Sequence, residues 1–154
     1  MADETYEELT MAAEKENKLR LIMGLQGSGK TQRFIQMVKD ALAEEKGLVV
    51  CIERGKRLTY DIPHEARLVE STDYGFVGYD YLKGFIAGLY AGNFDITHIF
   101  IDSVLRMIDQ PFDDKAESFF LWCEEFGQLH DVKFTMMVSK DVASAGDTIK
   151  GFLA

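Results

Sequence analysis

Short apolar runs alternate with amphipathic stretches along most of this chain. Apolar runs that predict strands occupy residues 19–23, 48–52, 98–101 and 134–138, with a shorter candidate at 67–69. The run at 48–52 is apolar on both faces, as a central parallel strand is. Amphipathic stretches over residues 30–45, 79–91 and 114–129 predict helices between them. Strands that alternate with helices predict an α/β fold with a mostly parallel sheet of about five strands, covered by helices on both faces as a three-layer sandwich.

Two local signals refine the predicted helices. Gly84, Gly88 and Gly92 recur at every fourth residue, and we interpret this spacing as a helix packed closely on the sheet, since the stretch is too short to span a membrane. Asp114 and Glu117 have the spacing of a capping box, which predicts that the third helix begins there.

The length of 154 residues suits one domain, which we place at residues 19–154. Residues 1–18 are charged and predict an N-terminal arm or short helix. Their acidic start is unlike a signal peptide, and no apolar run is long enough to cross a membrane. Cys51 and Cys123 lie far apart in apolar segments, which predicts buried free thiols in a reducing compartment and hence a cytoplasmic location.

The net charge of −9 comes from 17 basic and 26 acidic residues, and it opposes binding to nucleic acid or anionic lipid. The three histidines, His64, His98 and His130, form no close pair with one another or with cysteine, which argues against a zinc site. The net charge does not exclude a local basic patch, and the densest one is Arg54-Gly55-Lys56-Arg57.

The strongest chemical signal is the match of residues 24–31 to the phosphate-binding pattern G-x-x-x-x-G-K-[ST]. The matched segment, with the next residue, is Gly24, Leu25, Gln26, Gly27, Ser28, Gly29, Lys30, Thr31 and Gln32. It stands between a predicted strand and a predicted helix, so backbone N–H groups and the positive end of the helix would face an anion. We expect Lys30 to contact the β- and γ-phosphates of a nucleotide and Thr31 to bind Mg²⁺.

Two carboxylates follow other apolar strands. Asp102 follows Ile99-Phe100-Ile101 and is the candidate partner of Mg²⁺, acting through water; the alternative is that it caps the next helix. Ser103 comes next, where many phosphate-loop ATPases have their catalytic glutamate. Glu53, at the end of the second strand, is therefore the candidate group that activates the attacking water. Its alternatives are a solvated charge or an ion pair with Arg54 or Arg57.

Taken together, residues 49–53 and 99–103 resemble the RecA-like branch of the P-loop ATPases. The resemblance covers roughly residues 19–140. It implies a phosphate loop at 24–31, a catalytic glutamate at Glu53, a Mg²⁺-side aspartate at Asp102 and a γ-phosphate sensor at Ser139, next to Lys140. It also implies that the fifth strand lies between the first and the fourth, which would direct Ser139 toward the nucleotide. Members of this branch often assemble so that a neighbour's basic residue completes the site; candidates are Arg54, Lys56, Arg57, Arg106 and Lys140.

The sequence thus predicts an ATP-binding protein, a Mg²⁺-dependent ATPase that works with a protein partner or as a homo-oligomer. Two alternatives stay open: a small-molecule or nucleoside kinase, and a nucleotide-binding switch that does not hydrolyse. The chain ends soon after the fifth strand and is acidic, which argues against a recombinase or helicase. Val138-Ser139-Lys140-Asp141 lacks the asparagine and spacing with which GTPases recognise guanine, so we expect ATP.

Overall fold

The computed structural model describes residues 16–56, 58, 60–108 and 110–154. The elements run in this order: β1 (Leu19–Met23), α2 (Lys30–Glu44), β2 (Leu48–Glu53), β3 (Arg67–Glu70), the 3₁₀ helix η1 (Ser71–Tyr74), α3 (Gly78–Gly92), β4 (Ile96–Ile101), α4 (Val104–Ile108), α5 (Asp114–His130), β5 (Lys133–Val138), the 3₁₀ helix η2 (Val142–Ser144) and α6 (Asp147–Lys150). The arm predicted for residues 1–18 lies almost wholly outside the described residues.

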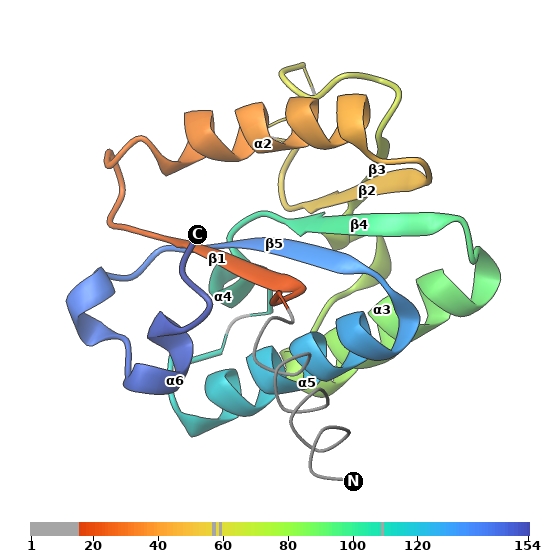
Figure 1. Ribbon diagram of the computed structural model, residues 1–154. Coiled ribbons are helices and arrows are strands. Elements are labelled where there is room, and N and C mark those ends of the chain that lie inside the picture. Colours follow the sequence, from red (N-terminus) through yellow and green to blue (C-terminus); the bar gives the residue numbers. More distant parts are fainter. Residues whose placement is uncertain (1–15, 57, 59, 109) are drawn as a thin grey trace, which may run out of the picture.

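The five strands form one sheet in the order β1-β5-β4-β2-β3, and every neighbouring pair is parallel. This confirms the α/β class, the five-stranded parallel sheet and the expected place of β5 between β1 and β4. Helix α2 covers one face of the sheet, and α3 and α5 cover the other (Figure 1). The carboxyl ends of the strands gather at one edge, where β1 leads into the loop before α2.

Two apolar cores lie on the two faces of the sheet. Alternate residues of each strand point to opposite faces, so Cys51 and Phe100 pack against α2, whereas Val50, Ile99 and Ile101 belong to the core under α3 and α5. The prediction that α2 presents an apolar stripe to the sheet is confirmed, because its residues at the spacing of one helix face are buried: Phe34, Ile35, Val38 and Ala41. Both cysteines are buried free thiols, as predicted.

The predicted capping box of α5 is wrong. Asp113, one residue earlier, is the N-cap, and its carboxylate accepts a hydrogen bond from the backbone N–H of Lys115 at 3.0 Å. Two consecutive aspartates offered two registers for the start of the helix. The residue with extended backbone occupies the cap position, which leaves Asp114 and Glu117 in the first turn, where their charge suits the helix dipole.

Helix α3 packs on the sheet as predicted, with Leu82 and Ile86 in the core, but its glycines do not lie at that contact. A Cβ atom at Gly84 or Gly88 would meet no atom within 4 Å, and both residues are exposed. Close packing therefore does not require glycine there. The close approach lies in α5 instead, where a Cβ at Gly127 would stand 2.5 Å from the carbonyl oxygen of Val132 and 2.7 Å from Cβ of Lys18.

Substituting alanine at these two kinds of position should have opposite effects on stability. Gly84→Ala should raise the free energy of unfolding by about 0.5–1 kcal/mol, because alanine restricts the unfolded chain and favours the helix. Gly127→Ala should lower it by about 1–3 kcal/mol, because the new methyl group overlaps buried backbone. Urea denaturation of the two variants measures both, and effects of the same sign would contradict this assignment of faces.

A buried histidine lies near the amino-terminal edge of the sheet, away from the phosphate loop. The ring of His98 stacks on that of Phe100 at 4.1 Å between centroids, and Nε2 lies 2.9 Å from Oγ1 of Thr135. Nδ1 lies 3.5 Å from Oε1 of Glu45, an oxygen that also accepts a hydrogen bond from Nζ of Lys133 at 2.8 Å. Burial lowers the pKa of His98 from 6.5 to about 4, against the opposing charge of Glu45.

His98 should make the fold less stable in mild acid. Its pKa is lower in the folded state, so the unfolded chain binds more protons as the pH falls from 6.5 to about 4, and stability falls over that range. The full difference between the two pKa values corresponds to a loss of up to about 3 kcal/mol in the free energy of unfolding. His98→Gln should reduce the loss of unfolding free energy between pH 7 and pH 4.5 by an appreciable part of that amount.

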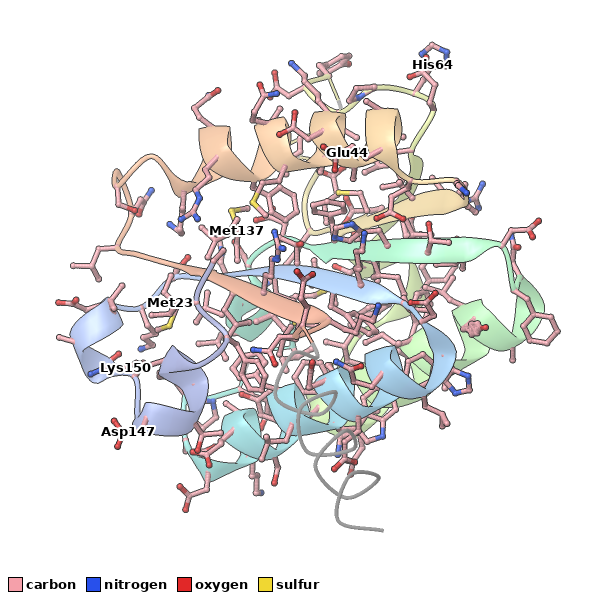
Figure 2. All side chains as sticks on the ribbon, viewed as in Figure 1. Met23, Glu44, His64, Met137, Asp147 and Lys150 are labelled. Carbon is pink, nitrogen blue, oxygen red and sulfur yellow. The ribbon has the colours of Figure 1, made fainter. Side chains whose placement is uncertain are left out.

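His64→Gln is the matched control, because the side chain of His64 is 95% exposed and projects from the connection between β2 and β3 (Figure 2). It should leave the pH dependence of stability unchanged. If both variants followed the wild-type curve of unfolding free energy against pH, His98 would not be the group that titrates on unfolding.

None of the helices in the described part of the chain combines the length and the apolar character that crossing a bilayer requires.

Candidate functional site

The loop of residues 24–31 connects β1 to α2 at the carboxyl edge of the sheet, toward the left in Figure 1. Gly27 and Gly29 have φ of 88° and 84°, a backbone conformation that strongly favours glycine. A Cβ at Gly24 would stand 2.4 Å from Oγ of Ser28, so the loop folds back closely on position 24 and a side chain there would displace that hydroxyl. Ser28 N–H closes a turn on the carbonyl of Leu25 at 3.1 Å. The glycines therefore occupy the positions where this compact loop requires them.

Helix α2 begins at the end of this loop with its first N–H groups available. Gly29 is the N-cap and has no side chain to accept a hydrogen bond from them, and the first turn carries no acidic residue. The first N–H groups of an α-helix have no partner within the helix, and they carry the positive end of its dipole. The loop and the start of α2 together form a concentration of N–H groups that suits an anion. Lys30 lies in this first turn, as does Gln32, which is exposed.

Asp102 comes directly after β4 at the same edge. Its backbone N–H donates to the carbonyl of Ile52 at 2.9 Å, which extends the ladder between β4 and β2 by one residue. Its side chain is almost fully buried, and Oδ1 accepts a hydrogen bond from Oγ of Ser103 at 2.9 Å. Ser103 has a φ of 49°, a left-handed conformation that is uncommon outside glycine. The chain thus makes a sharp turn at Ser103 and holds the carboxylate of Asp102 with the hydroxyl of that residue.

Glu53 ends β2, the strand beside β4, and is 0% exposed. Its Oε2 accepts a hydrogen bond from the backbone N–H of Leu58 at 2.8 Å. The alternative of a solvated strand-end charge is therefore wrong. For Arg54, the structure shows a hydrogen bond from Nη1 to the carbonyl of Arg106 at 2.6 Å. Arg57 lies outside the described residues.

Glu53 and Asp102 lie close together on one face of the sheet. Ile52 and Ile101 are paired in the register of β2 and β4, so the two carboxyl residues follow at adjacent strand ends. Both continue the alternation of Cys51 and Phe100 and so belong to the face that α2 covers. Both carboxylates also act on the thiol of Cys51. Burial raises the pKa of Cys51 far above its ordinary value, and the negative charges of Glu53 and Asp102 raise it further.

Ser139 follows β5, which lies between β1 and β4. The carbonyl of Val138 accepts hydrogen bonds from the N–H of Gly24 at 3.3 Å and of Lys140 at 2.9 Å, so the end of β5 is joined to the start of the loop. Ser139 and Lys140 are both exposed. The structure therefore brings every predicted site residue to the same edge of the sheet: the loop, the first turn of α2, Glu53, Asp102 and Ser139.

Sequence reasoning missed Glu70, which ends β3 in register with Glu53. Its carboxylate accepts hydrogen bonds from the backbone N–H groups of Gly55 and Lys56 at 2.9 and 2.8 Å. Burial opposes ionisation of Glu70, but these bonds and those from Thr72 hold its pKa below the ordinary value. The available signal was an acidic residue directly after a short apolar run, the same signal that identified Glu53.

No protein-family model matches the chain, and no curated protein matches it.

Proposed function

We propose that this protein is a Mg²⁺-dependent ATPase of the RecA-like P-loop type, which couples binding and hydrolysis of ATP to a protein partner or to its own assembly. One observation carries the proposal: two buried carboxylates, Glu53 and Asp102, lie at adjacent strand ends on the face covered by α2, the helix that the glycine loop begins. A phosphate site needs the loop alone, whereas hydrolysis also needs a metal-side carboxylate and a group that directs water.

The loop fits the phosphates of a nucleotide. Helix α2 starts without a side-chain cap and without an acidic residue, and the loop before it has two glycines with positive φ. An anion at this helix start would be bound by backbone N–H groups and by the helix dipole. The Nζ of Lys30 would add a positive charge at the β- and γ-phosphates. Ser139, at the end of the neighbouring strand, would contact the γ-phosphate and so distinguish ATP from ADP.

The residues also fit Mg²⁺. The part of the chain that is described holds no group of three or more His, Cys, Asp or Glu able to bind a metal. Mg²⁺ does not need one, because it keeps several waters and usually takes one or two carboxylates together with phosphate oxygens. The Thr31 hydroxyl would bind it directly, and Asp102 would bind it through water. When bound, Mg²⁺ neutralises charge that develops on the phosphates during transfer.

Glu53 would orient the attacking water and accept its proton. In the structure, however, the Glu53 carboxylate is fully buried and bonded to the N–H of Leu58. Water reaches it only after the groups that cover it rearrange. This observation favours a second candidate function, a nucleotide-binding switch that hydrolyses slowly until a partner or a second copy makes the carboxylate accessible.

Release of inorganic phosphate from ATP, measured over a series of protein concentrations with and without Mg²⁺, tests the proposal. An ATPase releases phosphate with ATP and Mg²⁺ alone, and turnover per chain that rises with concentration indicates assembly. Tight ATP binding without release supports the switch. Transfer to a small acceptor, without release to water, would make the protein a kinase and would contradict the proposal.

A further inference from the structure

The turn that follows Glu53 is held by a carboxylate from the next strand. Oε1 of Glu70 accepts a hydrogen bond from the N–H of Gly55 at 2.9 Å, and Oε2 accepts one from the N–H of Lys56 at 2.8 Å. Oε1 also accepts hydrogen bonds from Thr72, at 3.2 Å from its N–H and 2.8 Å from its hydroxyl. One carboxylate therefore accepts bonds from four donors, two of which belong to the turn.

This turn has an unusual backbone. Gly55 has φ of 82° and Lys56 has φ of 56°, so two successive residues are left-handed. The N–H groups of both residues donate to the carboxylate of Glu70. A left-handed conformation is unfavourable for a residue with a side chain. The bonds to Glu70 offset that cost at Lys56.

The course of the turn determines where the carboxylate of Glu53 lies. The chain leaves β2 at Glu53, passes through the turn and returns, so that the N–H of Leu58 donates to Oε2 of Glu53 at 2.8 Å. Just before the turn, Nη1 of Arg54 donates a hydrogen bond to the carbonyl of Arg106 at 2.6 Å. The acceptor that fixes the middle of the turn is Glu70.

We propose that Glu70 is a positioning residue, which holds the turn at Gly55 and Lys56 and through it keeps the carboxylate of Glu53 aligned for the attacking water. The inference rests on the proposed ATPase function. Glu70 lies on β3, at the opposite end of the strand order from β1 and its phosphate loop. Its loss should therefore slow the chemical step and leave nucleotide binding intact, since misplacing a reacting group by about 1 Å costs up to about 100-fold in rate.

The test compares kcat and the dissociation constant for ATP in the full-length chain. Glu70→Gln should lower kcat on the order of tenfold or more while the dissociation constant changes by less than about twofold. Glu70→Asp keeps the charge but has a shorter reach, so its kcat should be intermediate. Adding Lys56→Gly to Glu70→Gln should restore part of the lost kcat, because glycine adopts the left-handed turn without help. Glu65→Gln is the control, since it removes the same charge from an exposed position in the connection between β2 and β3, shortly before β3 begins.

Three results would overturn the inference: an unchanged kcat in Glu70→Gln, a loss of ATP binding as large as the loss of kcat, or a loss that Lys56→Gly leaves untouched. The second would mean that Glu70 only maintains the fold. If the wild-type chain bound ATP without turnover, the proposed function would fail instead, and this result is distinct from all three.

Discussion

Lys30→Ala should abolish turnover and weaken ATP binding by about 10–100-fold, the effect expected from removing charge-assisted hydrogen bonds to phosphate. Lys30 begins α2, and its side chain folds back over the loop, with Cδ 4.0 Å from where a Cβ of Gly24 would be. The backbone N–H groups would remain, so some affinity for phosphate should persist. Calorimetric titration with ATP and a phosphate-release assay measure the two effects separately.

Lys39→Ala is the matched control, because Lys39 is an exposed lysine on the same helix. It removes the same charge without touching the loop and should leave both ATP affinity and turnover unchanged. Equal losses in the two variants would mean that ATP affinity and turnover depend only on the overall charge of the protein. If Lys30→Ala bound ATP with wild-type affinity, the loop would not be part of the ATP-binding site.

Glu53→Gln should lower kcat by about 100-fold or more while ATP still binds with wild-type affinity. Glutamine is nearly the same shape as glutamate, and its carbonyl oxygen can still accept the hydrogen bond from the N–H of Leu58. It cannot take a proton from water. The variant should therefore fold and bind nucleotide, and the chemical step alone should slow. Single-turnover kinetics with saturating protein isolate that step from product release.

Glu44→Gln is a suitable comparison, because Glu44 is an exposed glutamate at the far end of α2. It should hydrolyse ATP at the wild-type rate. If Glu53→Gln also kept the wild-type rate, Glu53 would have only the structural role of fixing the loop at Leu58, and another group would direct the water.

Much of the fold follows from the sequence because the physical signals are local. Strands apolar on both faces, such as residues 48–52, can only be central strands of a covered sheet, and their bounds agree with the structure to within one or two residues. The details that failed depend on tertiary neighbours. Nothing in the spacing of Gly84 and Gly88 distinguishes a packed face from an exposed one, and Gly127 is required only because the backbone at Val132 passes beside it.

The gathering of the predicted site residues at one edge followed from a single topological fact, that the carboxyl ends of parallel strands share an edge. What sequence could not supply was the burial of Glu53 or its bond to Leu58, because both arise from the path of the connecting loop. The hydrogen bonds between Glu70 and the left-handed turn at Lys56 could not be predicted for the same reason. A carboxylate that accepts hydrogen bonds from a turn beside its strand produces no periodic pattern in the sequence.

A structure of the chain with a non-hydrolysable ATP analogue and Mg²⁺ tests the central claim most directly. The account predicts that the β- and γ-phosphates lie on the first N–H groups of α2, that Lys30 and Thr31 contact the phosphates and the metal, and that Asp102 faces the metal through water. It also predicts that Glu53 faces the γ-phosphate through a water, once the groups that cover its carboxylate have rearranged. Nucleotide bound elsewhere, or a γ-phosphate with Glu53 turned away and no water between them, would contradict it.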